Sequence, residues 1–233
     1  MIPAAPIFFD APIRYARAVE LQELLVAARQ RDEIPDTVLF LEHFPVVTLG
    51  RRARENFLLA KPAQLSAMGV DFFTASRGGD VTFHGPGQLV MYPVLKLGTV
   101  EADSHGYLQN LEETAIRTAA AFGIAAFRRK GMNGAWTESG KIAAIGFSLK
   151  RWVTMHGMSF NVNPDLRGFD LIVGCGLVGE KISSLEKILG AKCPPPARVR
   201  EKMAENFQKI MGRSFVPATE FPRLGNLAAP FFQ

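Results

Sequence analysis

Cys175 stands between two glycines, Gly174 and Gly176, in an otherwise apolar stretch of the chain. A cysteine thiolate is a strong nucleophile, and neighbouring glycines expose the sulfur and leave backbone N–H groups available to hold an oxyanion. The alternative is structural, because a lone cysteine is more often a small buried apolar residue. The flanking glycines favour nucleophilic chemistry at Cys175, and such chemistry also needs a partner that moves a proton.

Three side chains are candidates for that partner, namely His84, His156 and Lys141, and their separation along the sequence does not choose among them. Lys141 opens an apolar run that ends at Gly146, at the mouth of a predicted strand. The alternative is a lysine whose amine reaches solvent at a strand end. His156 begins the segment 156–163, HGMSFNVN, whose small residues leave room for a ligand along a strand or allow two strands to cross closely.

The densest block of polar and glycine residues lies at 77–88, with the sequence RGGDVTFHGPGQ. It places a cation (Arg77), an imidazole (His84) and an amide (Gln88) around a backbone that carries few side chains, so a ligand's polar group has access to backbone N–H groups. The glycines predict a loop between two strands, and the alternative role is a turn whose His84 caps a neighbouring strand. The glycine spacings of nucleotide sites, GxxxxGK[ST] and GxGxxG, are both absent.

The elements that must position these groups follow from periodicity and turn residues. Leu21, Leu24, Leu25 and Ala28 recur at helical spacing, which predicts a helix over about 12–31 that ends before Pro35. The further elements expected in the first half are strands at 37–41, 46–49, 71–75 and 91–97 and a short helix at 59–68. The glycine-rich loop at 77–88 therefore joins two of these strands.

The second half of the chain predicts a meander of strands between helices. Leu108, Leu111, Ala115 and Phe122 fit one face of a helix that stops at Gly123. The elements expected after it are strands at 124–127, 134–137, 141–149 and 153–162 and helices at 183–189 and 199–211. Strands outnumber βαβ units, so we predict an α/β (α+β) fold in which helices pack on one face of a mixed β-sheet, as a single domain over residues 1–233.

Composition is that of an ordinary soluble protein, with 233 residues of which 48% are hydrophobic and 21% charged. The net charge of +5 favours an acidic partner, but no basic helix or aromatic-basic motif points to nucleic acid. Two cysteines, Cys175 and Cys193, are too few for a disulfide framework and lack the spacing of a zinc site. The sequence has no leader pattern and no apolar run of about 18 residues, so we expect a cytoplasmic protein that binds no membrane. We also expect a monomer without a bound metal.

Taken together, these blocks resemble the octanoyltransferase family, also called lipoyl(octanoyl) transferase or lipoate-protein ligase B. The most specific part is the pattern RGGxxT[FY]HGPGQ followed by a tyrosine, which residues 77–88 and Tyr92 match. The resemblance covers most of the chain, from EHFPVVTLG at 42–50 to SSL at 183–185. A match of this length replaces the turn-only interpretation of the glycine-rich block.

The resemblance implies the fold of biotin and lipoate protein ligases, and octanoyl transfer from octanoyl-acyl carrier protein to lipoyl domains of 2-oxoacid dehydrogenases and to the glycine cleavage H protein. It implies a catalytic pair, Cys175 and Lys141, and no cofactor. The substrate-binding residues that it implies are Arg77, Gly78, Gly79, Asp80, Val81, Thr82, Phe83, His84, Ala144, Ile145, Gly146, Gly157, Met158 and Ser159. The family usually has a proline before the cysteine, and Gly174 gives this chain a freer backbone there.

In the implied mechanism, the Cys175 thiolate takes the acyl group from the carrier's thioester, and a lysine amine of the acceptor then attacks the octanoyl-enzyme. In this mechanism the Lys141 ammonium favours the thiolate form of Cys175, and Lys141 carries the protons that the two transfer steps release and take up. We expect its amine roughly 3 to 4 Å from the sulfur in one apolar tunnel floored by residues 77–84, with Cys193 apart from that tunnel. Because the donor is already a thioester, no ATP should be needed.

Two alternatives remain open. An ATP-dependent lipoate or biotin ligase on the same fold would activate a free acid as an adenylate and would need no cysteine. A catalytically inactive acyl- or carrier-binding protein would give Lys141 and Cys175 no chemical role. A requirement for ATP would distinguish the ligase from an acyltransferase. Formation of an acylated product would distinguish either enzyme from the inactive binding protein.

Overall fold

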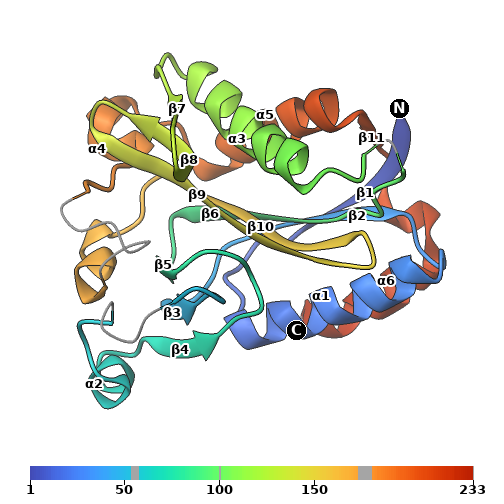
Figure 1. The fold of residues 1–233 in the computed structure, drawn as a ribbon, viewed down its shortest axis with the longest axis horizontal. Helices are drawn as coiled ribbons and strands as arrows, with labels where there is room; N and C mark the ends of the chain where they lie inside the picture. The colour runs from blue at the N-terminus through green and yellow to red at the C-terminus, as the bar shows by residue number, and fades with distance from the viewer. Residues whose placement is uncertain (54–57, 100, 173–179, 233) are drawn as a thin grey trace.

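Two β-sheets organise the computed structural model, which describes residues 1–53, 58–99, 101–172 and 180–232 (Figure 1). The larger sheet is mixed and eight-stranded, with the strand order β11-β1-β2-β6-β10-β9-β8-β7. Its strands are β1 (Ile2–Phe8), β2 (Asp36–Leu41), β6 (Gln88–Val94), β7 (Phe127–Arg129), β8 (Met132–Thr137), β9 (Gly140–Lys150), β10 (Val153–Asn161) and β11 (Arg213–Phe215). The smaller sheet, in the order β4-β3-β5, consists of β3 (Val46–Leu49), β4 (Asp71–Thr74) and β5 (Val81–His84).

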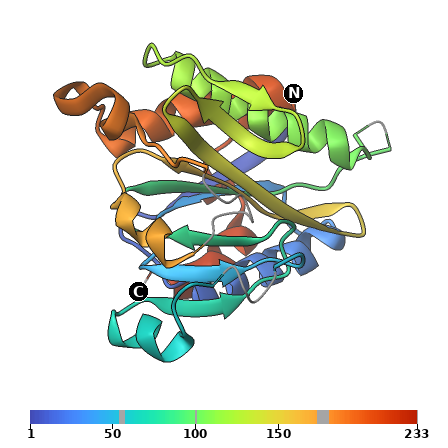
Figure 2. The ribbon, with the colours of Figure 1, turned by 60° about the vertical axis from the view of Figure 1, so that its left-hand side comes forward.

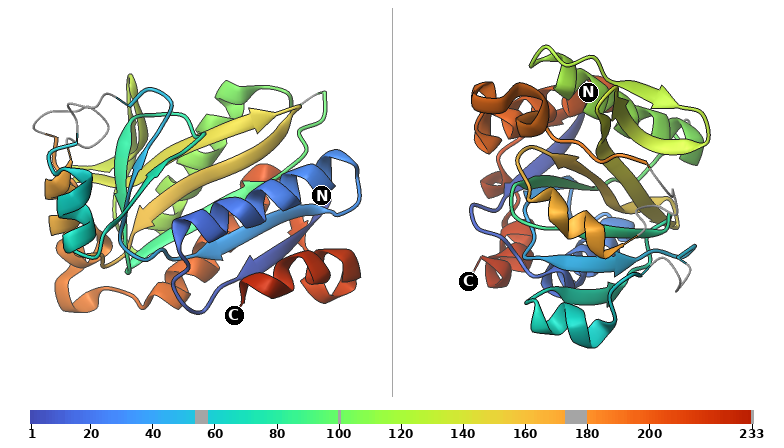
Figure 3. Two further views of the ribbon diagram at one scale, coloured as in Figure 1. Left: turned by 90° about the horizontal axis from the view of Figure 1, so that it is seen from below. Right: turned by 90° about the vertical axis from the view of Figure 1, so that its left-hand side faces the viewer.

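Helices cover both faces of the large sheet (Figure 3). They are α3 (Ser104–Ala120) and α5 (Pro196–Met211) on one face, and α1 (Tyr15–Gln30) and α6 (Pro222–Ala228) on the other. In β2, Val38 and Phe40 pack toward the first pair of helices, whereas Leu39 and Leu41 pack toward the second. The predicted fold class is confirmed, but the prediction of helices on one face is wrong, because a strand that is apolar on both sides needs cover on both.

The small sheet lies beside the large one, and α2 (Pro62–Ala67) packs at its outer side, next to β4 (Figure 2). Strand β3 pairs in parallel with β4 and antiparallel with β5. Val47, Val81 and Phe83 contribute to a separate apolar core in this part of the molecule. The small sheet therefore carries the glycine-rich segment on a rigid support and presents it to the large sheet.

The structure confirms the predicted helix at 12–31 and the strands at 37–41, 46–49 and 71–75, with small shifts at their ends. The prediction of a continuous loop over 77–88 is wrong, because Val81–His84 forms β5. Its register on β3 runs from Leu49 opposite Val81 to Val46 opposite His84. The glycines on each side of β5 mark two turns rather than one long loop.

The predicted meander is also present, and its last two strands matter most for function. Strand β9 pairs antiparallel with β10, with Gly146 opposite Gly157. Arg151 and Trp152 turn the hairpin with positive φ values of 51° and 61°, as a tight two-residue hairpin turn requires. The strand expected at 124–127 lies slightly later, at Phe127–Arg129.

Three further elements have no counterpart among the predictions, namely β1, β11 and α6. Pro3 and Pro6 hide β1, because each proline lacks a backbone donor and argues against an internal strand. Among the described residues, no helix is both long and apolar enough to cross a lipid bilayer. The remaining short helices are η2 (Leu166–Leu171), α4 (Leu185–Leu189), η4 (Gly190–Lys192), η5 (Ala218–Glu220) and η6 (Ala229–Phe231).

Candidate active site

Backbone contacts join the glycine-rich segment to strand β9. The N–H of Gly78 donates to the carbonyl of Phe147 at 2.8 Å. A Cβ atom added to Gly146 would lie 2.8 Å from the carbonyl oxygen of Gly78, closer than such atoms approach. Gly79, with a φ of 84°, adopts a backbone conformation that other residues rarely use. These glycines let two backbones meet, so two of the segments implied to bind substrate lie side by side.

Arg77 is buried and directs its guanidinium into the small sheet. Its Nη2 donates to the carbonyl oxygen of Thr48 at 2.8 Å and to the Thr48 hydroxyl at 2.7 Å. Its Nη1 donates to the carbonyl oxygen of Gly78 at 3.1 Å. Asp80 accepts from the Val81 N–H at 2.8 Å. In this structure Arg77 and Asp80 therefore hold the shape of the segment around Gly78.

The three residues 157–159 have different surroundings: two pack against other strands or the core, and one faces a cavity. A Cβ atom added to Gly157 would lie 2.4 Å from the carbonyl oxygen of Met91, so this glycine lets β10 pass close to β6. This contact is the close crossing of two strands that was the alternative interpretation of residues 156–163. Met158 belongs to the apolar core, whereas Ser159 faces the narrow cavity that also contacts Lys141.

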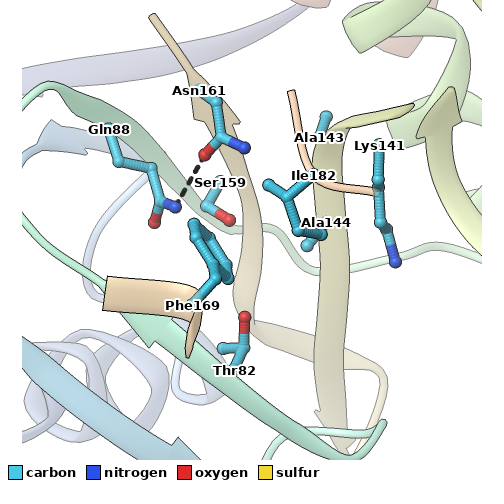
Figure 4. Close-up of a pocket in the computed structure, with 9 residues that line it drawn as sticks. All are labelled: Thr82, Gln88, Lys141, Ala143, Ala144, Ser159, Asn161, Phe169 and Ile182. Atoms are coloured by element: carbon cyan, nitrogen blue, oxygen red, sulfur yellow. Dashed lines mark hydrogen bonds between the residues drawn. The ribbon is translucent and has the colours of Figure 1, made fainter. Parts of the chain in front are cut away.

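This cavity lies where strand β5 of the small sheet approaches β6, β9 and β10 of the large one (Figure 4). Its walls are Thr82, Gln88, Lys141, Ala143, Ala144, Ser159, Asn161, Phe169 and Ile182. One end is polar, because the Gln88 amide donates to Asn161 Oδ1 at 2.8 Å, and the Asn161 amide donates to the Ser183 carbonyl at 2.9 Å. Apart from Lys141, the other lining residues are small or apolar, and the cavity holds only about 10 Å³.

Lys141 is buried, with 5% of its surface exposed. Its amine nitrogen lies 5.2 Å from the centroid of the Trp136 ring, a cation–π contact. The interpretation of Lys141 as a lysine that reaches solvent is therefore wrong. Its backbone N–H donates to Lys181 at 2.8 Å, and its carbonyl accepts from Ser183 at 2.9 Å. The chain from 181 to 183 thus runs parallel to β9 beside this lysine.

Cys175 and its neighbours Gly174 and Gly176 lie outside the described residues. Cys193 is described and is half-buried, with its sulfur 3.8 Å from the carbonyl oxygen of Val162. Burial, together with the nearby Glu186 carboxylate, raises the pKa of the Cys193 thiol. Cys193 does not line the cavity beside Lys141, in agreement with the expectation that it stands apart.

Three histidines and two tyrosines form a buried polar cluster behind the glycine-rich segment. The members of this histidine–tyrosine cluster are Tyr15, His43, His84, Tyr92 and His156. His43 donates from Nδ1 to the Ile13 carbonyl at 2.9 Å, which leaves Nε2 to accept from the Tyr92 hydroxyl at 2.8 Å. His84 Nδ1 donates to the Gln88 side-chain oxygen at 2.6 Å. His156 Nε2 lies 3.1 Å from the Ser76 hydroxyl.

Burial keeps these imidazoles neutral near pH 7. It lowers the pKa of His43 to about 4 and, with the charge of Arg77, that of His156 to about 3. The pKa of His84 is also well below its ordinary value, chiefly through burial. Burial raises the pKa of Tyr15 to about 12. The cluster is therefore an uncharged network, and His84 and His156, two candidate proton carriers, already have side-chain partners within it.

Sequence reasoning missed His43 as a member of this cluster. The available signal was its place in the EHFPVV segment at 42–47, where the resemblance begins. Among the described residues, no group of three or more His, Cys, Asp or Glu side chains is arranged to hold a metal ion. The described geometry combines a buried lysine, a narrow cavity with one polar end and otherwise mostly small or apolar walls, and a glycine-lined backbone.

Comparison of the sequence with known proteins matches one catalytic-domain family and several octanoyltransferases. Residues 14–208 match the lipoyl protein ligase A/B catalytic domain. An octanoyltransferase of Chloroflexus aurantiacus is 46% identical over 201 residues, covering 85% of this chain and 90% of that protein. An octanoyltransferase of Caldicellulosiruptor saccharolyticus is 45% identical over 206 residues, covering 87% of each chain.

Solved structures share the fold at low sequence identity. A bi-partite lipoate protein ligase from Thermoplasma acidophilum has a TM-score of 0.70 and 15% identity, covering 100% of this chain and 92% of its own. A lipoate-protein ligase A bound with ATP has a TM-score of 0.71 and 14% identity, covering 99% and 93%. Biotin protein ligase from Aquifex aeolicus has a TM-score of 0.54 and 12% identity, covering 89% and 70%. The predicted fold relationship is confirmed.

Proposed function

The chain belongs to the lipoyl protein ligase A/B catalytic domain family, and we propose that it moves an octanoyl group from acyl carrier protein to a specific lysine of lipoyl domains through a thioester on Cys175. It is an acyltransferase, since relatives at 42% to 46% identity over most of its length are octanoyltransferases. The proposed acceptors are the lipoyl domains of 2-oxoacid dehydrogenases and the glycine cleavage H protein. We further propose that it works in the cytoplasm as a monomer without a cofactor.

One observation carries the assignment of Lys141. Its side chain is buried in the wall of the narrow cavity, and its backbone is hydrogen-bonded to Lys181 and Ser183. Lys181 follows Cys175 by 181 − 175 = 6 residues, so the chain that leaves the cysteine is anchored on the strand that carries the lysine. This topology supports a cysteine–lysine pair formed by residues 34 positions apart in sequence (175 − 141 = 34).

In the first half of the proposed reaction, the Cys175 thiolate attacks the carbonyl carbon of the carrier thioester. The tetrahedral intermediate collapses, a new thioester forms on Cys175, and the carbon–sulfur bond to the carrier breaks. Lys141 in its ammonium form favours the Cys175 thiolate beforehand and gives a proton to the departing thiolate of the carrier, which leaves as the thiol. The exchange of one thioester for another is nearly balanced in free energy.

In the second half, the neutral amine of the acceptor lysine attacks the octanoyl thioester on Cys175. Lys141, now neutral, accepts a proton from the attacking nitrogen, and the Cys175 thiolate leaves as the amide forms. Lys141 is then an ammonium again and the cysteine is again a thiolate, so the cycle closes. Conversion of a thioester into an amide is favourable, which drives the overall transfer without nucleotide hydrolysis.

The acyl chain is proposed to lie along the narrow cavity. Ala144 and Ser159 line it directly and are opposite each other on β9 and β10. Gly157 and Met158 lie opposite Gly146 and Ile145, so they set the position of the β9 wall. Residues 77–84 supply the facing wall through Thr82. The cavity holds only about 10 Å³ in this structure, so the proposal requires its two walls to move apart when the acyl chain binds.

A transfer assay without nucleotide tests this function against an ATP-dependent ligase on the same fold. Purified protein is mixed with octanoyl-acyl carrier protein and a lipoyl domain, in the absence of ATP and magnesium. We expect octanoylated lipoyl domain, and none with a lipoyl domain whose target lysine is replaced by arginine. Strict dependence on ATP would assign the chain to the ligases. Absence of product under both conditions would leave only a binding protein.

A further inference from the structure

An open cleft of about 540 Å³ lies further along β9 than the cavity beside Lys141. Residues 145–149 of β9 line it, and so do Gly78 and Gly79 of the glycine-rich segment. Because Gly146 packs directly on Gly78, the cleft adjoins the segments to which the proposed function assigns the acyl chain. Its chemistry differs from that of the narrow cavity, since its distinctive residues are cationic rather than apolar.

Arg51 and Arg52 both line this cleft with exposed side chains. Their backbones are fixed, because the Arg51 N–H donates to the Arg77 carbonyl at 3.0 Å and the Arg52 N–H donates to the Gly79 carbonyl at 3.1 Å. Within the described ranges, neither guanidinium forms an ion pair or a side-chain hydrogen bond. The Arg77 guanidinium, in contrast, already donates to Thr48 of β3 and to the Gly78 carbonyl. Two anchored arginines thus present their donors to the cleft.

The facing wall is the start of helix α3, where Ser104 and His105 line the cleft. This 17-residue helix places the positive end of its dipole and its first N–H groups there. The Asp103 carboxylate accepts from the His105 N–H at 2.9 Å and offsets part of this positive end, so the arginines supply most of the positive charge. Among the described residues that line the cleft, none is acidic. The arginine side of the cleft therefore favours an anion, and paired arginines match the geometry of phosphate oxygens.

We propose that the cleft between Arg51, Arg52 and the start of α3 binds the phosphodiester of the phosphopantetheine arm that presents the donor thioester. This inference rests on the proposed function, because an acyl carrier holds its thioester on such an arm. It adds a binding site for the donor that is separate from the acyl chain and the reacting atoms.

The spacing along β9 agrees with the length of the arm. From Lys141 to Gly146 the strand advances five residues, which is roughly 16 Å for a strand. The arm has about 13 bonds between phosphorus and sulfur, and three bonds of an extended chain span about 3.5 Å, so its reach is roughly 15 Å. The two lengths are similar, so a phosphate in the cleft near Gly146 places the thioester near the end of β9 that carries Lys141.

The test compares two small donors that differ only in the phosphate, octanoyl-4′-phosphopantetheine and octanoyl-pantetheine. For the wild-type enzyme we expect kcat/KM to be about tenfold higher for the phosphorylated donor, a typical effect of charge-assisted hydrogen bonds. Arg51→Gln combined with Arg52→Gln should remove most of this preference and leave kcat/KM for octanoyl-pantetheine nearly unchanged. Arg198→Gln, an exposed arginine on α5, is the matched control and should keep the preference.

Binding of free 4′-phosphopantetheine and of pantetheine, followed by NMR titration, separates failure of the site from failure of the proposed function. If the wild type transfers no acyl group but prefers the phosphorylated ligand, and the double variant does not, the site stands and the transferase proposal falls. If the wild type shows no preference, or the double variant retains it, the phosphate site is wrong. A double variant impaired only with intact carrier protein would instead assign the arginines to carboxylates on the carrier's surface, which also overturns the proposal.

Discussion

The backbone N–H of Lys141 donates to the carbonyl of Lys181 at 2.8 Å. This bond ties the start of strand β9 to a segment 40 positions later in the chain (181 − 141 = 40). Ser183 closes the same contact from the other side, by donating to the Lys141 carbonyl at 2.9 Å. The backbone position of Lys141 is therefore set by this pairing, independently of the charge on its side chain. Substitutions of the side chain should consequently separate chemistry from folding.

Replacement of Lys141 by methionine keeps the length and apolar stem of the side chain and removes the amine. We expect the rate of acyl transfer to fall by at least about a hundredfold, because proton transfer loses its carrier. Thermal unfolding should change by only a few degrees. Single-turnover transfer and circular dichroism melting measure the two effects, with Lys181→Met as the control for a neighbouring lysine. A Lys141→Met enzyme of nearly normal rate would remove Lys141 from the mechanism.

Gly146→Ala should disturb the contact between β9 and the glycine-rich segment. The added methyl would lie 2.8 Å from the Gly78 carbonyl oxygen and 3.3 Å from Arg77 Cδ, so the backbones must separate. Overpacking of this kind costs about 1 to 3 kcal/mol, and KM for the acyl donor should rise. Gly225→Ala on α6 is the control, since nothing lies within 4 Å of its added carbon. Equal melting temperatures for the two variants would refute the close approach.

The histidine–tyrosine cluster should make stability depend on pH. The folded-state pKa of His43, about 4, lies below its ordinary value of 6.5, so the unfolded chain binds more protons between these values. Stability should therefore decrease as pH falls from about 6.5 to about 4. His43→Gln should reduce this slope in denaturant unfolding, whereas His105→Gln, an exposed histidine, should leave it unchanged. A slope that is the same in His43→Gln and wild type would mean that His43 is not held neutral.

Salt should affect encounter with the carrier more than chemistry. The chain has a net charge of +5, and acyl carrier protein is expected to be acidic. Screening by salt weakens attraction between charged surfaces, so KM for octanoyl-acyl carrier protein should rise severalfold between low and high salt while kcat changes little. Octanoyl-pantetheine serves as the uncharged donor and should show a much smaller rise. Equal salt dependence for both donors would exclude electrostatic docking.

Much of the fold was predictable from local pattern, and the exceptions have physical reasons. The helix at Tyr15–Gln30 and the β9–β10 hairpin follow from apolar periodicity and turn residues. Strand Val81–His84 was hidden, because the glycines that flank it look like one loop when tertiary pairing with β3 is unknown. Strand Ile2–Phe8 was hidden by its two prolines.

The candidate site was predictable in its residue types but not in their roles. The sequence marked Arg77 as a cation near a ligand, yet the guanidinium is held by Thr48, 29 positions away. It marked Gly157 as room for a ligand, whereas that glycine accommodates the carbonyl of Met91 on a neighbouring strand. Such contacts between distant segments decide what a side chain does, and periodicity along one segment carries no information about them.

The central claim is an octanoyl thioester on Cys175, and intact mass measurement tests it most directly. The protein is incubated with octanoyl-acyl carrier protein in the absence of an acceptor, quenched in acid and analysed whole and after proteolysis. We predict a mass increase of one octanoyl group, lost on treatment with hydroxylamine, mapped to the peptide with Cys175, absent in Cys175→Ala and retained in Cys193→Ala. An unmodified wild-type protein that still octanoylates lipoyl domains, or an adduct that persists in Cys175→Ala, would contradict the account.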